Sequence, residues 1–543
     1  MKNRYLRLAL SLLVAVALLA LFLTLRQSGE HSTTGHAIGV PVQTPNVLLI
    51  IADDMGVDKM GAYADDVPGY RAEAAYLPDT PVLDDLASVG VRFTDAWANP
   101  SCSPTRGALF TGNHAFRTGV GKPIGKEGAS NLQDSAFTIA ETLGLEGYTS
   151  GMFGKWHLGE NAIPEDWSEG DDWGDHLGER FSFQTPALVQ GWDRFYGSVP
   201  GGLDADSEDG GYYSWVAVFN NRCEGCAVED PVQIRTVSKY ATIETIGAAR
   251  DWIAQQDRPW MVSLTLNAPH TPFELPPSGC NYRAEDGLPP QALNQPAVYE
   301  EMVECMDRQL GVLLDSIDDL ANTLVIFVGD NGTDYRVAEG DFDDDRGKGT
   351  LYESGVRVPL IIADGAAVVG LAPDEGNPDD CTVIPGVGLR CRQPHRLISD
   401  PGSTSDAPVH VVDLFATIAE TVGAQSNTGL DSVSLVPLLS DVEGPVREVN
   451  YAEAYSSDGS GNFALRSGDW KLTGRTSIPD DSACLADSGL FNLSSDRFEA
   501  EDLTADAQLE GEAQQALSEL LSELDALADS ADTLPWFAAD DCP

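Results

Sequence analysis

The sequence predicts an α/β fold in which strands buried on both faces form a parallel sheet. Residues 46–52 and residues 323–328 are rich in leucine and β-branched residues, and polar and apolar side chains do not alternate along them. Such runs are typical of strands that helices cover on each side of the sheet. The chain has 543 residues, of which 42% are hydrophobic and 22% are charged, so it can form a large core and a second lobe.

The N-terminal segment predicts export. Basic residues precede an apolar run at residues 8–25, which is long for the core of a cleaved signal peptide and short for a membrane span. Residues 1–26 therefore serve either as an uncleaved signal anchor that holds the protein on a membrane or as a signal peptide. A polar linker follows at residues 27–45, and we expect the rest of the chain to be periplasmic or extracellular.

The cysteine content agrees with export. Of the nine cysteines, Cys102 lies in a motif described below, and the other eight form an even set that suits an oxidising compartment. Proximity in sequence favours four disulfides, namely Cys223 with Cys226, Cys280 with Cys305, Cys381 with Cys391, and Cys484 with Cys542. Other pairings stay open. The first pair could also be half of a zinc site, but no second Cys/His pair at zinc spacing accompanies it.

The charge balance excludes some partners. The chain has 33 basic and 85 acidic residues, a net charge of -52. Nucleic acid and anionic membrane surfaces are therefore poor partners, and an acid-rich surface suits a saline habitat. The same field repels anionic substrates, so an anion site needs its own concentrated positive charge. Lys155 and Lys348, two of only eight lysines, lie in motifs that could supply it.

Acidic and amide side chains follow the two predicted buried strands. Asp53 and Asp54 come directly after the first strand, and Asp330 and Asn331 come after the second. Ligands of open parallel sheets bind beyond the carboxyl ends of the strands, so these groups should lie at one place. Because all four offer oxygen, they predict a site for calcium or magnesium. The alternative is that both motifs are turns, in which Asp, Asn and Gly are common.

Residues 102–112 predict a helix that binds an anion at its N-terminus. Pro104 suits a first helical turn, which places Cys102 at the start of the helix. Arg106 follows one helical turn later, where its planar guanidinium could hold oxygens of a tetrahedral oxyanion beside the free N–H groups of the helix. The alternative is a buried structural cysteine.

Three further clusters bring histidines and lysines to loops. Lys155 and His157 follow a strand-like run at residues 149–153, and their alternation predicts that both leave the strand on the same side. His270 follows another apolar run. Lys348 lies between two glycines, which allow a close approach of the backbone. Each of these clusters alone is also compatible with ordinary packing or solvated surface.

The chain from residue 440 to residue 543 predicts a smaller C-terminal subdomain. It begins with strand-like segments, and leucine and alanine recur at helical spacing between residues 509 and 527, with acidic residues on the opposite side. This pattern predicts an amphipathic helix that packs against the rest of the protein.

Together and in this order, the motifs resemble those of the type I, formylglycine-dependent sulfatases, arylsulfatase-like members of the alkaline phosphatase superfamily. The resemblance extends from about residue 45 to residue 505. It implies a large mixed, mostly parallel sheet flanked by helices, with a smaller C-terminal α+β lobe, and a catalytic domain at residues 46–435. In this family the cysteine of the pattern Cys-x-Pro-x-Arg is oxidised to formylglycine by a maturation enzyme, which here would act on Cys102.

The resemblance also implies a role for each candidate residue. One calcium ion would be held by Asp53, Asp54, Asp330, Asn331 and the modified residue 102. A hydroxyl of the hydrated aldehyde would attack sulfur, with Asp330 assisting. Arg106 and Lys155 would hold sulfate oxygens, and His270 and Lys348 would bind the substrate and protonate the leaving group. His157 would then take a proton from the second hydroxyl and expel sulfate.

The expected substrate is a sulfated small molecule or glycan, a sulfate monoester of a phenol or carbohydrate. A phosphonate monoester or phosphodiester hydrolase of the same superfamily is the nearest alternative, and a non-catalytic surface protein that binds anions or glycans is another. Insertions at residues 165–175 and 204–213 either border the pocket or form solvated surface. The sequence does not settle the oligomeric state.

Overall fold

The computed structural model describes most of the chain between residues 44 and 530. The described residues are 44–64, 77–126, 128–159, 175, 177, 180–181, 185–204, 210–221, 231–282, 294–339, 346–370, 381–384, 388–391, 397–425, 429–444, 447–457, 460–476, 488–505, 509 and 511–530. The chain divides into one compact unit of residues 43–377 and 392–543 and a second unit of residues 1–42 and 378–391.

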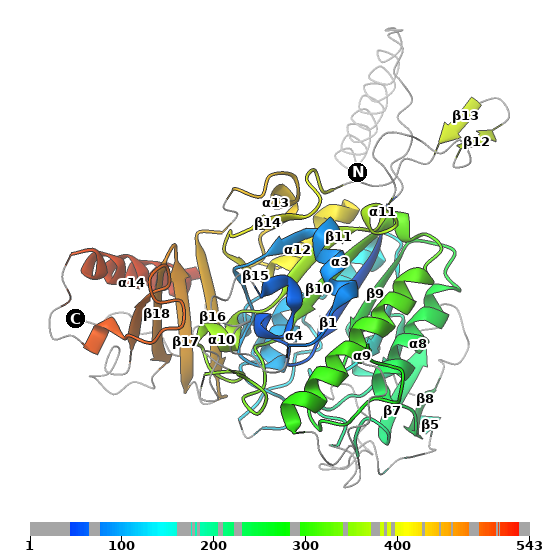
Figure 1. Ribbon diagram of the computed structural model, residues 1–543, viewed down its shortest axis with the longest axis horizontal. Coiled ribbons are helices and arrows are strands. Elements are labelled where there is room, and N and C mark those ends of the chain that lie inside the picture. The colour runs from blue at the N-terminus through cyan, green and yellow to red at the C-terminus, as the bar shows by residue number, and fades with distance from the viewer. Residues whose placement is uncertain are drawn as a thin grey trace, which may run out of the picture. The chain divides into compact units, whose positions relative to one another are not determined.

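The larger unit is built on an 11-stranded sheet (Figure 1). From one edge to the other the strands are β14 (Ser403–Ser405), β2 (Val91–Phe93), β11 (Leu360–Asp364), β10 (Thr323–Gly329), β1 (Asn46–Ala52), β9 (Trp260–Thr265), β4 (Thr149–Gly154), β6 (Arg194–Gly197), β7 (Trp215–Asn221), β8 (Val232–Val237) and β5 (Arg180–Phe181). The five strands from β10 to β6 run parallel, and β11 and β7 pair antiparallel on either side of them. The predicted mixed, mostly parallel sheet is confirmed.

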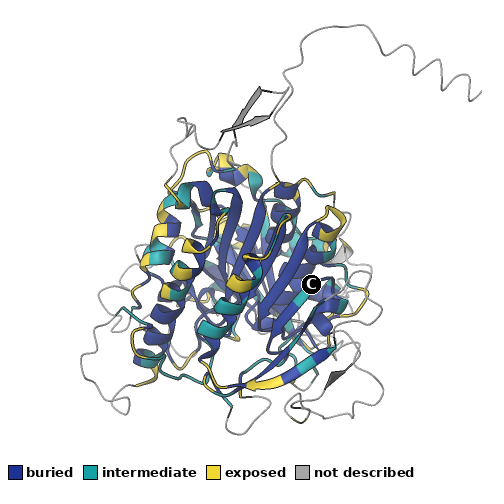
Figure 2. Ribbon diagram, turned by 90° about the vertical axis from the view of Figure 1, so that its right-hand side faces the viewer, coloured by how far each residue is buried: buried dark blue, intermediate teal, exposed yellow. Residues whose placement is uncertain are grey.

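Helices cover both faces of this sheet. Alternate residues of β1 enter two separate cores, since Leu49 packs on one face and Ile50 on the other, and both faces are buried (Figure 2). This arrangement is the reason why the strand sequence shows no alternation. The first face carries α4 (Cys102–Thr111), α6 (Ile139–Leu145), α12 (Asp413–Val422) and α13 (Val436–Ser440). The second face carries α3 (Pro81–Val89), α8 (Ala241–Ile253) and α9 (Gln295–Asp315).

Short elements complete the larger unit. They are the α-helical turns α5 (Ala115–Thr118), α7 (Pro186–Val189), α10 (Glu353–Val356) and α11 (Gly365–Val368), the 3-10 turns η1 (Val57–Lys59), η2 (Gly61–Tyr63), η5 (Leu320–Asn322) and η8 (Leu503–Ala505), and the paired strands β3 (Ala96–Trp97) and β15 (Val409–His410). His410 is fully buried beside the ring of His114.

The parallel register aligns the carboxyl ends of the central strands. Ala52 at the end of β1 pairs with Gly329 at the end of β10, and the backbone N–H of Asp330 donates to the carbonyl of Ala52 at 3.0 Å. The polar residues that follow these two strands therefore lie next to each other. Strand β4 also ends at this edge, where Gly154 pairs with Thr265 of β9.

A C-terminal lobe of the same unit has its own small sheet. Strands β16 (Val449–Tyr455), β17 (Gly461–Ser467), β18 (Trp470–Thr476) and β19 (Gly489–Asn492) are antiparallel neighbours in this order. Helix α14 (Glu512–Ser530) packs its leucines, among them Leu520 and Leu524, against this sheet. The buried amine of Lys471 in β18 contacts the carboxylates of Glu353 and Glu499 at 3.1 and 2.8 Å.

One predicted disulfide is confirmed, between Cys280 and Cys305. In the smaller unit, strands β12 (Cys381–Ile384) and β13 (Gly388–Cys391) form an antiparallel hairpin in which Cys381 lies opposite Cys391, and their disulfide stays a prediction. The other four cysteines, Cys223, Cys226, Cys484 and Cys542, lie outside the described residues.

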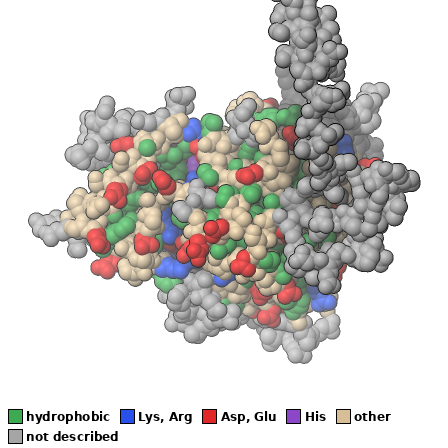
Figure 3. Space-filling model, turned by 90° about the horizontal axis from the view of Figure 1, so that it is seen from above, with side chains coloured by type: hydrophobic (Ala, Val, Ile, Leu, Met, Phe, Trp, Pro, Cys, Tyr) green, Lys and Arg blue, Asp and Glu red, His purple; other side chains and the backbone are tan. Residues whose placement is uncertain are grey.

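Two more sequence-based predictions concern the segment at residues 8–25 and the surface charge. The segment at residues 8–25 lies outside the described residues, and within the described part of the chain no helix has the length and apolar character of a membrane span. Acidic side chains are spread widely over the face of the molecule in Figure 3, as the net charge of -52 requires.

Candidate active site

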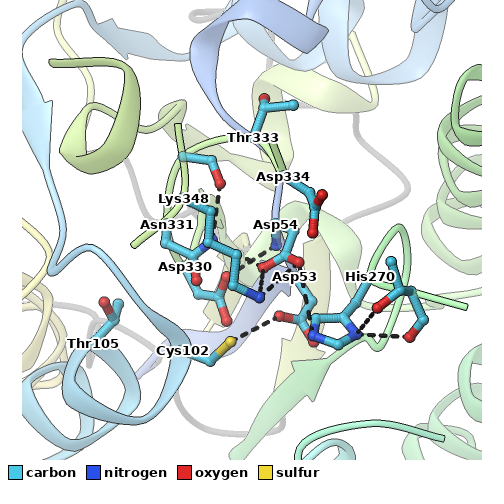
Figure 4. A network of polar contacts seen from close by, with 12 residues as sticks. Asp53, Asp54, Cys102, Thr105, His270, Asp330, Asn331, Thr333, Asp334 and Lys348 are labelled. Atoms are coloured by element: carbon cyan, nitrogen blue, oxygen red, sulfur yellow. Dashed lines mark hydrogen bonds and ion pairs between the residues drawn. The ribbon is translucent and has the colours of Figure 1, made fainter. Parts of the chain in front are cut away.

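The first residue of α4 is Cys102, as its position before Pro104 predicts. The preceding Ser101 is extended, and every residue of the helix is buried. Cys102 is only 1% exposed and is the free cysteine of the described residues. Its Sγ lies 3.3 Å from Oδ1 of Asp53. The helix therefore directs this side chain toward the carboxyl ends of β1 and β10 (Figure 4).

Asp53 is shared between the cysteine and a cation. Its second oxygen, Oδ2, lies 2.6 Å from Nζ of Lys155, and all three side chains are buried. An ammonium group without accessible water needs such an anionic partner, because burial of an unpaired charge is very costly. Asp53 thus ties the loop after β4 to the helix that carries Cys102.

Asp54 contacts a second group of side chains. It adopts a left-handed conformation with φ 67°, which turns its carboxylate toward Lys348, whose Nζ lies 2.7 Å from Oδ2. Asn331 donates through Nδ2 to Oδ1 at 2.9 Å, and Nε2 of His270 lies 3.7 Å from Oδ2. Side chains that follow β9 and β10 therefore converge on the carboxylate of Asp54, which follows β1 (Figure 4).

Arg106 holds Asp330 on the other side of the site. Both Nε and one terminal nitrogen of its guanidinium donate to Oδ2 of Asp330, at 3.1 and 2.9 Å. The other terminal nitrogen donates to the carbonyl of Lys155 at 2.9 Å. Because Arg106 lies one helical turn after Cys102, it faces the same side of α4. The loop of Lys348 is fixed nearby by a hydrogen bond from Gly349 to the carbonyl of Pro100, at 2.7 Å.

Burial and nearby charges shift the pKa values of this cluster in opposite directions. Burial opposes ionisation of Asp54, but the cations led by Lys348 outweigh it and hold the pKa of Asp54 well below its usual range. Burial, together with the charge of Asp53, raises the pKa of Asp330 to about 6 although Arg106 opposes the shift. Two adjacent carboxylates therefore have very different affinities for a proton, a pattern typical of functional sites.

The thiol of Cys102 is protonated in this environment. Burial raises its pKa far above the ordinary value, and the charge of Asp53 acts in the same direction. Since the thiolate is the nucleophilic form of cysteine, an unmodified Cys102 is a poor nucleophile here. The position is therefore unsuited to thiol catalysis.

The donor set fits a hard cation. Asp53, Asp54 and Asp330 supply carboxylate oxygens, and Oδ1 of Asn331 is buried without a hydrogen-bond partner among the described residues. Buried polar atoms normally have a partner, and calcium binds oxygen ligands, so an unpaired buried oxygen beside three carboxylates fits a calcium ligand. Donor atoms of Asp53, Asp54, Cys102 and His270 also lie within 4.8 Å of one another, although the sequence did not place His270 beside the metal ligands.

The two histidines reach the site through loops. His270 and His157 both line the same cavity as Cys102. Lys155 and His157 lie beyond strand β4, which ends at Gly154, so strand alternation alone does not direct them to the site. His157 instead has a left-handed backbone, φ 54°, and its Nε2 lies 3.1 Å from the carbonyl of Ile124 while its buried Nδ1 has no partner.

A cavity of about 1090 Å³ opens above these residues. Its lining runs from Cys102 and Lys348 to the C-terminal lobe, where Ser456 and Gly461 border it. Asp204, at the start of one predicted insertion, also lines it, whereas residues 165–174 of the other insertion lie outside the described residues. The cavity therefore involves both the main domain and the lobe.

Lys122 and Lys126 also line the cavity, and the sequence motifs did not point to them. They belong to the loop after α5 and lie in no recognisable motif. A signal was present in the composition, because lysine is rare in this chain and an anion site in an acidic protein must concentrate positive charge.

Polar side chains at the carboxyl ends of parallel strands mark the usual active site of an α/β enzyme. The chain matches the Sulfatase family over residues 45–424. It therefore belongs to the sulfatase family and is a sulfuric ester hydrolase, of a family that acts on aryl and carbohydrate sulfates.

Individual relatives agree with this assignment. Human arylsulfatase A is 29% identical over 489 residues, which cover 84% of this chain and 81% of the relative. N-acetylgalactosamine-6-sulfatase of the dog is 28% identical and covers 60% of this chain and 58% of its own. Among solved structures, the PsFucS1 sulfatase from Pseudoalteromonas sp. has a TM-score of 0.60 at 22% identity, covering 90% of this chain and 92% of that one, which is evidence for the shared fold.

Proposed function

We propose that the protein hydrolyses sulfate monoesters of phenols or carbohydrates through a formylglycine formed from Cys102, with one calcium ion. The observation that carries this proposal is the environment of Cys102. The thiol is buried at a helix N-terminus, contacts a carboxylate at 3.3 Å and has a strongly raised pKa. A thiol in this position has no evident chemistry of its own, whereas an aldehyde hydrate there would face both an anion-binding helix end and a cation site.

The ligand set supports calcium. Asp53, Asp54, Asp330 and the unpartnered Oδ1 of Asn331 would hold the ion, together with an oxygen of the modified residue 102. When bound, calcium would polarise a sulfate oxygen and favour the ionised form of a coordinated hydroxyl.

The cations would then hold the sulfate group. Arg106 and Lys155 are fully buried and anchored on carboxylates, so their charges are preorganised for transition-state stabilisation. Lys348 and His270 border the open cavity and would bind the substrate and donate a proton to the leaving oxygen. His157, with its free Nδ1, would accept a proton when sulfate is expelled.

The confirmed disulfide between Cys280 and Cys305 supports export to an oxidising compartment, periplasmic or extracellular. A formylglycine-generating enzyme would then be an obligatory partner during maturation. Anchoring on a membrane through residues 8–25 stays part of this proposal. The substrate would be a sulfated aryl compound or glycan, as the names of the relatives indicate for those proteins.

Mass spectrometry of the peptide that contains residue 102 tests the proposal. The protein would be produced with a maturation system and exported, and 4-nitrophenyl sulfate and a phosphonate monoester would be assayed in parallel. We expect the mass of an aldehyde in place of the thiol, calcium-dependent turnover of the sulfate ester, and loss of both in Cys102→Ala. An unmodified cysteine in protein from the native host would contradict the mechanism and favour a binding module. Preference for the phosphonate would favour the alternative hydrolase.

A further inference from the structure

The described lysines of this chain differ in whether they form ion pairs with carboxylates. Lys2 lies outside the described residues, and five of the other lysines pair with carboxylates, namely Lys59, Lys155, Lys239, Lys348 and Lys471. Lys122 and Lys126 form no ion pair with any described residue, and both line the cavity above Cys102. In a chain with 85 acidic residues, two cations at one cavity that pair with no described carboxylate are unexpected unless an external anion uses them.

The C-terminal lobe fixes the loop that carries these lysines. The backbone N–H of Tyr455 donates to the carbonyl of Gly121 at 2.9 Å, and that of Ser457 donates to Gly128 at 2.8 Å. At Gly121 any side chain would collide with Tyr455, whose carbonyl oxygen lies 2.5 Å from the position of a Cβ atom. The loop is thus held at both ends, by the last residue of β16 and by Ser457 just beyond it, so its lysines lie on a fixed rim.

The amine of Lys122 is positioned by a neutral group. Its Nζ donates to Oγ of Ser456 at 2.7 Å, a contact that orients the ammonium without neutralising it. Lys126 is exposed. By contrast, the guanidinium of Arg336 on the same cavity is satisfied by the carboxylate of Asp334, at 2.8 and 2.7 Å. Within the cavity lining, the free positive charge outside the sulfate site therefore belongs to the two loop lysines.

We propose that Lys122 and Lys126 form a second anion subsite that binds another sulfate or carboxylate of the same substrate molecule. This inference rests on the proposed function, since it takes the scissile sulfate to bind beside residue 102. The preferred substrate is then a polyanionic saccharide and not a simple aryl sulfate. The size of the cavity agrees, because about 1090 Å³ exceeds the range of roughly 300–1,000 Å³ that is typical for sites of drug-sized ligands.

Substrate pairs that differ by one anionic group test the subsite. The matured protein, Lys122→Gln/Lys126→Gln and the control Lys239→Gln would be assayed on a monosulfated disaccharide and on its disulfated counterpart. Lys239 is a suitable control because it is exposed and pairs with Glu244, and its replacement removes a positive charge without changing the lining of the cavity above Cys102. We expect the ratio of kcat/KM values, disulfated over monosulfated, to fall about tenfold in the double variant, mainly through KM, and to stay unchanged in the control.

Two further arms identify the anion and the role of charge. A monosulfated disaccharide with a uronate distinguishes a carboxylate from a second sulfate as the recognised group. Lys122→Arg/Lys126→Arg should retain the preference, and added salt should weaken it in the wild type. A ratio that the Gln variant leaves unchanged, with normal turnover, would overturn the subsite alone. If the wild type hydrolyses neither sulfate ester, the proposed function fails. Binding of the disulfated disaccharide would then be measured by equilibrium dialysis. An unchanged affinity of the double variant would overturn the subsite as well.

Discussion

The carboxylate of Asp53 bridges Cys102 and Lys155, with one oxygen 3.3 Å from the thiol and the other 2.6 Å from the ammonium. All three groups are shielded from solvent, so this carboxylate balances a buried positive charge and also sets the polarity around the residue that would be modified. Removal of its charge should therefore affect both the stability and the chemistry of the site.

Asp53→Asn tests this double role. The substitution leaves the ammonium of Lys155 buried without its nearest anion, so we expect the free energy of unfolding to fall by about 3–5 kcal/mol and sulfate ester hydrolysis to be lost. Urea denaturation measures the first effect. The exposed Asp251→Asn, which removes an ion pair with Arg250 at the surface, should lower stability by less than about 1 kcal/mol. Equal effects of the two substitutions would contradict a buried, essential Asp53.

Arg106→Lys separates charge from geometry. The guanidinium makes two hydrogen bonds to Asp330 and one to the carbonyl of Lys155, and an ammonium cannot reproduce this planar arrangement. We expect kcat to fall about 10²–10³-fold, as when a transition-state donor is removed. Arg117→Lys, in an ion pair with Asp431, is the matched control and should retain activity. Full activity of Arg106→Lys would show that the positive charge alone suffices.

Calcium should stabilise the protein as well as activate it. A ligand that binds only the native state at 100 times its Kd adds about 2.7 kcal/mol to the free energy of unfolding. Protein dialysed against a chelator should therefore show a higher Tm when calcium is restored, and Asn331→Ala should reduce this shift, since Oδ1 of Asn331 has no other partner. Magnesium serves as the comparison ion. A Tm that is independent of both ions would exclude the proposed metal site.

Much of the site could be predicted from the sequence because its residues follow strands that are easily recognised. The run before Asp53 and the run before Asp330 are buried on both faces, and parallel register brings their ends together. Pro104 similarly marks the start of the helix at Cys102. Each of these signals is local in the sequence. Because the carboxyl ends of parallel strands meet at one edge of the sheet, residues that follow different strands are expected to lie close together.

Other features depended on contacts that the sequence does not encode locally. The approach of His270 to Asp54 follows from strand order, and the orientation of His157 follows from a left-handed residue after the end of β4. Lys122 reaches the cavity because the loop is fixed against Ser456 and its neighbours in a lobe more than 300 residues further along the chain. Sequence spacing carries no information on such a contact.

The buried Glu453 should make stability depend on pH. Burial raises its pKa to about 8, whereas the unfolded chain has an ordinary carboxyl pKa near 4.5. The folded state therefore holds a proton that the unfolded state releases, so stability is fully present below the unfolded pKa and is lost as pH rises through the folded pKa. Each pKa unit corresponds to about 1.4 kcal/mol.

Glu453→Gln removes this dependence while keeping an oxygen for the backbone N–H of Phe116, which donates to Oε1 at 2.6 Å. We expect the variant to gain stability relative to the wild type between about pH 5 and about pH 9, measured by urea denaturation across this range. Glu519→Gln, at an exposed position of α14, is the control. A constant difference between variant and wild type over the whole range would contradict the raised pKa.

Lys471 connects the C-terminal lobe to the main domain through buried charge. Its amine contacts Glu353 and Glu499 and lies 4.7 Å from the centre of the Trp97 ring. Lys471→Met fills the same space but leaves two carboxylates without their cation, so we expect a loss of about 3–5 kcal/mol in the free energy of unfolding. Lys239→Met at the surface should change little.

Hydrogen exchange distinguishes the loss of a docking contact from general destabilisation. If Lys471 mainly holds the lobe, exchange in β16–β19 and in the loop of Lys122 should accelerate in Lys471→Met, while β1 and β10 keep the protection of the wild type. Because the lobe clamps that loop against Tyr455, the same variant should also lose the preference for a disulfated substrate. Uniform acceleration across all strands would instead mean that the lobe and the main sheet unfold as one cooperative unit.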